Sequence, residues 1–291
     1  MNALATRFAG FVAIDWSGAA GERHRGIAVA RAAAGDGAPA LVRPGHRWSR
    51  PEVLDWLLDL ATADCLVGLD LGISLPFADA GAFFPGLAAS PPDIRALWAV
   101  VEQTCAVDPH LGASSFVDHP LFAPYFRRHG GREGALFGSG IGRLRVTERA
   151  QAAMGCRPCS NFNLVGAAQV GKSSLTGMRM LHRLSAGLPV WPVDPLPRSG
   201  PVVCEIYTSL AALEARRTAG RSKMRSHADL NAALAELGSA PVPGDGPITD
   251  HASDALLTAA WLRRAAARPA LWDPAGLAEV AATEGWTFGA L

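Results

Sequence analysis

Acidic side chains recur at the ends of short apolar segments that have the composition of buried strands. Asp15, Asp70 and Glu205 each lie at or next to the end of one such segment. An ionised carboxylate in an apolar strand is costly unless a cation or a metal compensates it, and the sequence sets no matching cation beside each acid. Carboxylate oxygens are the ligands that Mg²⁺ and Mn²⁺ prefer. The pattern therefore predicts a site for Mg²⁺ or Mn²⁺, and two such ions about 4 Å apart would activate water and stabilise the leaving oxygen of a phosphodiester.

A predicted helix over Asp250–Ala267 supplies further candidate ligands. Asp250, His251 and Asp254 fall in its first turn or just after it. The i,i+4 spacing of Asp250 and Asp254, and the i,i+3 spacing of His251 and Asp254, let either pair share one helix face. The opposing interpretation is that strand-end acids face loops and that Asp250 is a helix N-cap. We favour the metal site, with ligands predicted at Asp15, Asp70, Asp250, His251 and Asp254 and catalytic carboxylates at Asp15, Asp70, Glu205 and Asp254.

Hydrophobic spacing and turn residues indicate the elements that must position these acids. Three strands in a meander come first, then a helix that starts at Pro51 and ends near Ala61, then another buried strand. This β-β-β-α-β order predicts an α/β fold with a mixed sheet. The expected strands are Phe11–Trp16, Gly26–Arg31, Ala40–Arg43 and Cys65–Leu71.

The middle of the chain is irregular and rich in Gly, Pro, Phe and Arg. We interpret the chain as one domain over residues 1–291 with a large insertion at 77–200. The expected elements there and beyond are helices at Pro92–Cys105 and Gly177–Ala186, a linker at Pro189–Pro201, a strand at Val202–Tyr207 and a helix at Ser226–Leu237.

The four acid-bearing segments resemble domain-of-unknown-function family 429, a bacterial family of predicted ribonuclease-H-like (RNase H-like) nucleases. They are Val12–Gly18, Val67–Pro76, Cys204–Ser209 and Asp250–Leu256. The last is also similar to the closing helix of Holliday-junction resolvases, where a His or Asp precedes the final Asp by three positions. The resemblance covers residues 8–76 and 200–268. It implies an RNase H-like mixed sheet and a metal held by Asp15, Asp70 and Asp254, with His251 or Asp250 completing the site.

A second motif points to a different chemistry. Gly166–Ser173 fits the P-loop pattern in full, with Gly166, Gly171, Lys172 and Ser173 as the candidate nucleotide-binding residues. A P-loop cradles phosphates with backbone N–H groups and its lysine. A working P-loop also needs a later strand that ends in Asp, and the next apolar strand ends in Glu205 instead. The turns after Asp15 and Asp70 also resemble the phosphate turns of actin-like kinases.

The nearly neutral net charge of the chain limits how it could bind nucleic acid or a membrane. A net charge of +1 creates no global field toward nucleic acid or membrane, so DNA or RNA would have to be held by local basic patches. One basic stretch lies between Arg127 and Arg149, and another runs from Arg216 to Arg225. The candidate substrate-binding residues are Arg221, Lys223 and Arg225. No apolar run approaches the ~20 residues of a membrane span, and the first segment is a poor signal peptide, so we expect a cytoplasmic protein without membrane contact.

The working hypothesis is a hydrolase: a nuclease dependent on Mg²⁺ or Mn²⁺ that cleaves phosphodiesters of DNA or RNA. The alternatives are a nucleotide-binding NTPase or kinase-like protein that uses Gly166–Ser173 or the Asp-x-Gly turns, and a non-catalytic protein with an RNase H fold.

Overall fold

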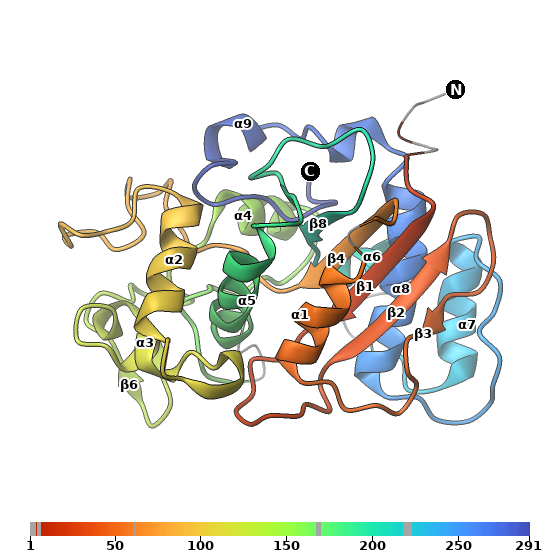
Figure 1. Cartoon of the computed structure of the whole chain (residues 1–291), viewed down its shortest axis with the longest axis horizontal. Coiled ribbons are helices and arrows are strands. Elements are labelled where there is room, and N and C mark those ends of the chain that lie inside the picture. Colours follow the sequence, from red (N-terminus) through yellow and green to blue (C-terminus); the bar gives the residue numbers. More distant parts are fainter. Residues whose placement is uncertain (1–3, 5–6, 61, 167–169, 218–222) are drawn as a thin grey trace.

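The computed structural model describes residues 4, 7–60, 62–166, 170–217 and 223–291. Helices cover both faces of a central sheet (Figure 1). Within the described ranges, no helix combines the length and the apolar character needed to cross a membrane. The α-helices are α1 (Arg50–Leu58), α2 (Ile94–Thr104), α3 (Ser114–Asp118), α4 (Val146–Ala153), α5 (Val170–Leu184), α6 (Thr208–Glu214), α7 (His227–Glu236), α8 (Asp250–Ala265) and α9 (Leu277–Val280).

The central sheet is mixed. In the described part of the chain its strand order is β3-β2-β1-β4-β8-β7. The pairs β1–β2 and β2–β3 are antiparallel, and the pairs β1–β4, β4–β8 and β8–β7 are parallel. The strands are β1 (Gly10–Asp15), β2 (Ala28–Ala33), β3 (Ala40–Leu41), β4 (Cys65–Asp70), β7 (Val190–Trp191) and β8 (Val202–Glu205). The predicted α/β fold with a mixed sheet is confirmed, and the arrangement is consistent with an RNase H-like fold.

Alternating side chains of β1 face different helices. Val12 and Ile14 belong to the hydrophobic cluster that contains residues of α1 and α5. Phe11 and Ala13 belong to the cluster that contains the buried face of α8. Successive strand residues point to opposite faces of a sheet, so Asp15 points to the same side as Ala13, toward α8. The alternation of the strand therefore decides which helix its terminal acid meets.

Polar side chains set the starts of the helices that flank the sheet. Ser49 Oγ accepts a hydrogen bond from the Glu52 backbone N–H, and the Glu52 carboxylate accepts one from the Ser49 backbone, a reciprocal capping box. At the start of α8, Thr249 Oγ1 accepts from the Ala252 N–H. Thr249, rather than Asp250, is therefore the N-cap, which leaves the Asp250 carboxylate free for other partners.

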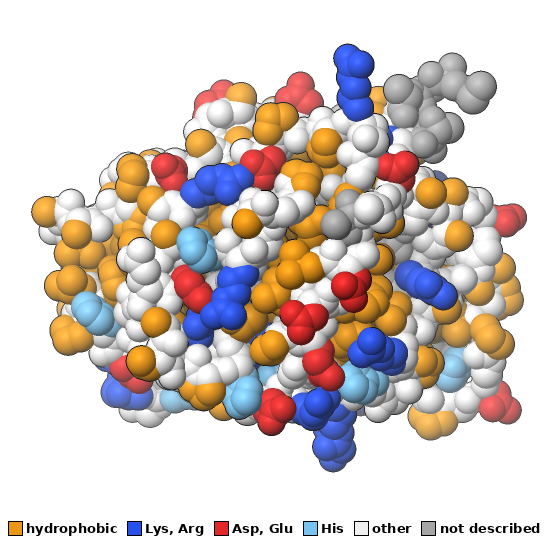
Figure 2. Space-filling model, viewed as in Figure 1, with side chains coloured by type: hydrophobic (Ala, Val, Ile, Leu, Met, Phe, Trp, Pro, Cys, Tyr) orange, Lys and Arg blue, Asp and Glu red, His pale blue; other side chains and the backbone are white. Residues whose placement is uncertain are grey.

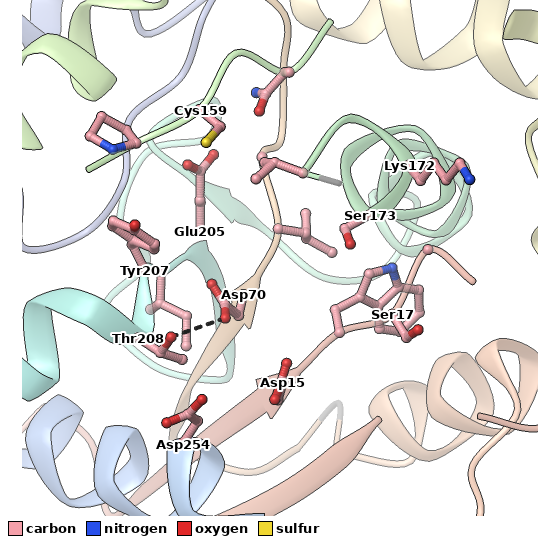
Figure 3. Close-up of a pocket in the computed structure, with 18 of the residues that line it drawn as sticks. Asp15, Ser17, Asp70, Cys159, Lys172, Ser173, Glu205, Tyr207, Thr208 and Asp254 are labelled. Carbon is pink, nitrogen blue, oxygen red and sulfur yellow. Dashed lines mark hydrogen bonds between the residues drawn. The ribbon is translucent and has the colours of Figure 1, made fainter. Parts of the chain in front are cut away.

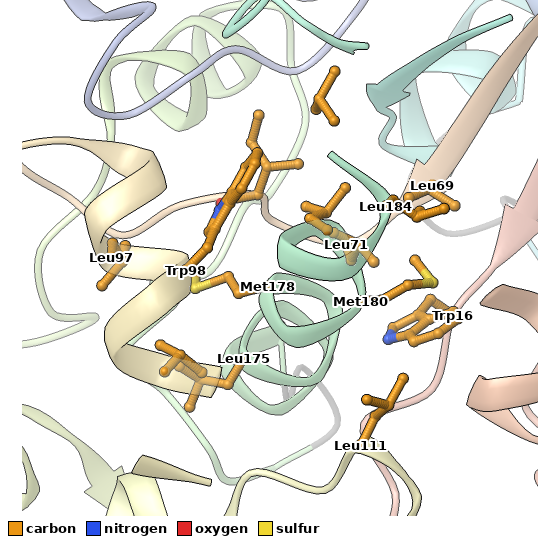
Figure 4. Packing of buried hydrophobic residues seen from close by; sticks show 14 of the residues in the cluster. Trp16, Leu69, Leu71, Leu97, Trp98, Leu111, Leu175, Met178, Met180 and Leu184 are labelled. Atoms are coloured by element: carbon orange, nitrogen blue, oxygen red, sulfur yellow. The ribbon is translucent and has the colours of Figure 1, made fainter. Parts of the chain in front are cut away.

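The segment between β4 and β8 carries several elements of its own. Helix α5 packs against α2 through Leu97, Trp98, Leu175 and Met178 (Figure 4). It begins at Val170 instead of the predicted Gly177. The predicted linker at Pro189–Pro201 contains a short edge strand, β7. The segment also holds a small hairpin of β5 (Arg127–Arg128) and β6 (Arg132–Glu133), and 3₁₀ turns at Pro109–Leu111 and Ala123–Tyr125; another 3₁₀ turn, Pro269–Leu271, follows α8.

Candidate active site

Asp15 and Asp70 end neighbouring parallel strands and are partners in register. Ala13 in β1 and Leu66 in β4 both pack toward α8. Asp15 follows Ala13, and Asp70 follows Leu66, by an even number of residues, and such residues point to the same face of a strand. Both carboxylates therefore leave the same face of the sheet at the same edge. They line a pocket of about 490 Å³ (Figure 3).

The first turns of α8 bring His251 and Asp254 to the same pocket. Asp254 faces the two strand-end acids in Figure 3. His251 Nδ1 lies 2.8 Å from Asp15 Oδ2, and the imidazole side chain is 47% exposed. The i,i+3 spacing predicted for one helix face thus places a histidine and an acid on the pocket wall.

The carboxylates facing this pocket repel one another. Burial raises the pKa of Asp70 well above its usual range, and the charges of Asp15 and Asp254 raise it further. Burial and then the Asp15 charge raise the pKa of Asp254 to about 7. Burial also raises the pKa of Asp15, against the opposing hydrogen bond from His251, and that hydrogen bond raises the pKa of His251. The site carries more negative charge than its neighbours compensate, which is the condition that favours a bound cation.

The side chains are turned toward protein partners instead of toward one common point. Asp15 bonds His251, and the Thr208 hydroxyl donates to Asp70 Oδ2 at 3.3 Å (Figure 3). Over the described residues, no group of three or more His, Cys, Asp or Glu side chains is placed to hold a metal ion. The donor chemistry fits Mg²⁺ or Mn²⁺, because all the acids supply hard oxygen atoms.

Glu205 lines the pocket but is held in an ion pair. Its register partner is Leu69, which packs toward α5, so its side chain leaves the opposite face of the sheet from Asp70. Arg145 binds it with two hydrogen bonds, Nη2 to Oε1 at 2.6 Å and Nη1 to Oε2 at 2.8 Å. Thr287 Oγ1 and the Ile73 backbone N–H also donate to this carboxylate. The expectation that no matching cation serves each acid is therefore wrong for Glu205.

That expectation is wrong for Asp250 as well. Lys223 Nζ and Arg225 Nε each lie 3.3 Å from an Asp250 carboxylate oxygen. These two cations lower the pKa of Asp250 against the opposing effect of burial. Lys223 also lines the pocket, whereas Asp250 and Arg225 are not among its lining residues. Arg221, the third predicted substrate-binding residue, lies outside the described residues.

The P-loop-like segment contributes to the same pocket through its end. Lys172 and Ser173 line the pocket in the first turn of α5, and Lys172 Nζ lies 2.7 Å from His129 Nε2. Gly166 adopts a left-handed backbone with φ of 84°. The residues before it do not form a strand of the central sheet; Asn163 makes an isolated bridge to Arg127. The strand that precedes a P-loop is absent from this part of the described chain.

Several lining residues were not predicted from the sequence. Arg145, Arg157, Cys159 and Asn161 all come from the segment between β4 and β8. Asn161 is fully buried, its Nδ2 donates to Ser74 O at 2.7 Å, and its Oδ1 accepts no hydrogen bond from any described residue. No periodicity marks these positions, because they lie in loops or at a helix start. The only feature of the sequence that could have pointed to them is that they lie in a Gly- and Pro-rich segment, which is typical of loops that carry functional residues.

No family model, curated protein or solved structure matches this chain. The arrangement of the sheet is consistent with an RNase H-like fold.

Proposed function

We propose that this chain is a phosphodiesterase dependent on Mg²⁺ or Mn²⁺, related to the RNase H-like nucleases of family 429. The observation that carries the proposal is the register pairing of Asp15 with Asp70, with Asp254 facing both from α8. Burial raises the pKa values of Asp15, Asp70 and Asp254, and the charges of neighbouring acids raise those of Asp70 and Asp254 further, a pattern that favours binding of a cation.

Asp15, Asp70 and Asp254 would hold the metal. When bound, the ion would lower the pKa of a water molecule and neutralise charge on the phosphate oxygens. His251 orients Asp15 through its Nδ1 and is placed on the pocket wall to take a proton from the attacking water. Thr208 orients Asp70 in the same way through its hydroxyl group.

Glu205 and Asp250 have other roles in this proposal. Arg145 holds Glu205 on the opposite face of the sheet, and Lys223 and Arg225 hold Asp250 outside the pocket. We assign Glu205 to positioning, because its carboxylate fixes the Ile73 backbone just after the Asp70 strand. Of the interpretations drawn from the sequence, nucleotide binding at Gly166–Ser173 is the weaker one, because no described strand of the central sheet leads into that segment, of which residues 167–169 lie outside the described part of the chain.

Hydrolysis of bis(p-nitrophenyl) phosphate in Mg²⁺ or Mn²⁺ tests the proposal. Asp15→Asn, Asp70→Asn and Asp254→Asn should each lower the rate by about 100-fold or more, because each removes a charged ligand. Asp245→Asn is the matched control, since Asp245 is an exposed acid away from the pocket. Calorimetric titration with Mn²⁺ distinguishes the proposed metal-dependent enzyme from a non-catalytic protein with an RNase H fold. Failure of the wild-type protein to bind Mn²⁺ at any pH between about 6 and 8, a range that spans the raised pKa of Asp254, would overturn the proposal.

A further inference from the structure

The candidate active site is a cup that opens to solvent and is bounded by packed segments on two sides. Its volume of about 490 Å³ falls in the range of small-ligand pockets, roughly 300–1,000 Å³. The carboxylates Asp15, Asp70 and Asp254 form one part of the cup. Lys172 and Ser173 lie across from them, and Cys159 and Tyr207 lie to another side (Figure 3).

One wall is closed where the turn after β1 meets the start of α5. A Cβ atom added at Gly18 would lie 2.4 Å from both the Lys172 carbonyl carbon and the Ser173 backbone nitrogen. Contact this close leaves no channel between the turn and the helix. A nucleic-acid strand therefore cannot pass out of the pocket on this side.

Another wall is closed by the loop that follows α4. Tyr207, just after β8, donates its hydroxyl to the Arg157 backbone oxygen at 3.4 Å. Further along the loop, a Cβ at Gly72 would lie 2.3 Å from Asn161 Nδ2. The loop is therefore packed both on the end of β8 and on the turn after β4.

Among the described residues of the two basic stretches, most cations are paired with acids of the chain itself. In the first stretch, Arg128 and Arg143 pair with Asp118 and Asp79. In the second, Lys223 and Arg225 share Asp250. On the face shown in Figure 2, Lys and Arg side chains are scattered, and most adjoin Asp or Glu. A duplex-binding protein instead offers several cations to consecutive phosphates.

From these observations we infer that the pocket takes one terminal nucleotide, free or at the end of a single strand, and excludes duplexes and internal positions of a strand. This inference rests on the proposed phosphodiesterase function and specifies its substrate. Ser173 binds the phosphate from the side opposite the carboxylates. Lys172, whose Nζ lies 2.7 Å from His129 Nε2 on the outer side of α5 (Figure 3), turns from that partner to bind the same phosphate. The buried Asn161 Oδ1, with no described hydrogen-bond donor, accepts from an N–H or hydroxyl group of the nucleotide.

Cleavage of matched substrates in Mn²⁺ tests the inference. They are a linear single strand, a covalently closed single-stranded circle of the same sequence, the blunt duplex, and the p-nitrophenyl ester of thymidine 5′-phosphate. The linear strand and the small ester should be cleaved at least about tenfold faster than the circle and the duplex, because only they can place a phosphate at the carboxylates. Equal rates on circle and linear strand would overturn the inference and leave the proposed function standing. No cleavage of any substrate, the small ester included, would overturn both.

A binding measurement gives a second readout that does not depend on turnover. Lys172→Met should weaken the binding of thymidine 5′-monophosphate about tenfold, because a charge-assisted hydrogen bond to the phosphate is lost. Arg31→Met, which removes an exposed cation from β2 remote from the pocket, should leave binding unchanged. Unchanged binding in Lys172→Met would contradict the assignment of this side of the cup to the phosphate.

Discussion

Asp15 and His251 are separated by 236 residues in the sequence, yet Asp15 Oδ2 and His251 Nδ1 lie 2.8 Å apart. The carboxylate stabilises the charged imidazolium and so raises the pKa of His251. The same hydrogen bond fixes the orientation of Asp15 at the end of β1. This pair joins the first strand of the sheet to α8 at the candidate active site.

The first prediction concerns this pair. His251→Ala should lower Mn²⁺-dependent hydrolysis by about 10- to 100-fold, the usual cost of losing a group that orients a metal ligand. Burial raises the pKa of Asp254, and the Asp15 hydrogen bond raises that of His251, so protonation of both groups should lower the wild-type rate on the acid side; without His251 this acid limb should become less steep. The measurement is kcat/KM between about pH 5 and pH 9, a range that spans the ordinary histidine pKa. His182→Gln serves as the control, because His182 lies in the last turn of α5 and does not line the pocket. An unchanged pH profile in His251→Ala would contradict the prediction.

The second prediction concerns stability in the absence of metal. The pKa of Asp254 is raised to about 7 in the folded protein, above about 3.9 in the unfolded chain. The folded state therefore holds this proton more tightly, and stability is lost as pH rises through about 7. Asp254→Asn cannot ionise, so at pH 8 it should be more stable than the wild type by on the order of 2 kcal/mol, with little difference near pH 4.

Urea unfolding in a chelator at both pH values measures this difference. Added Mn²⁺ should reverse the order at pH 8, because only the wild type keeps all its ligands and gains binding energy. A variant less stable than the wild type at pH 8 without metal would show that the Asp254 charge is compensated by the protein.

The third prediction concerns the buried Arg145–Glu205 pair. Arg145→Met leaves Glu205 and Glu148 buried without their cation and should cost about 3–5 kcal/mol of unfolding free energy. Adding Glu148→Gln and Glu205→Gln to Arg145→Met should restore much of the loss, because the uncompensated charges are then gone. Urea unfolding of the single and triple variants checks this, and equal losses in both would exclude charge burial as the cause.

The fourth prediction concerns the closed wall of the pocket. Gly18→Ala introduces a methyl group 2.4 Å from the backbone of Ser173, so the turn and α5 must separate. Overpacking of this kind should cost about 1–3 kcal/mol and raise KM for the small ester. Gly187→Ala is the control, since a Cβ there meets nothing within 4 Å. If both variants unfold at the wild-type urea concentration, the turn does not pack on the helix as described.

The contrast between Asp70 and Glu205 explains how far the sequence could predict this molecule. Apolar runs, the helix signal at Pro51 and the order of elements were enough to predict the mixed sheet and the strand-end placement of Asp15 and Asp70. The face on which Glu205 lies could not be predicted, because every residue before it in β8 is apolar and buried. The sequence of this strand therefore shows no alternation of polar and apolar residues that would assign each side chain to a face of the sheet.

The partners of these acids were also beyond local prediction. Arg145 lies 60 residues before Glu205 and reaches it only through the folded insertion. Arg225 lies 25 residues before Asp250, in the turn that precedes α7. Loop residues such as Asn161 follow no periodicity, so their presence in the pocket depends on tertiary packing alone.

The last part of the chain reaches back to the candidate active site at several points. Thr287 forms a parallel bridge to Glu205, and the Glu284 carboxylate accepts backbone hydrogen bonds from Phe77, Ala78 and Val146. During synthesis, therefore, the sheet strands leave the ribosome well before the residues that fasten the loops around them. The site is completed only when translation has passed residue 287, and a growing chain carries its unpaired acids without a finished pocket until then.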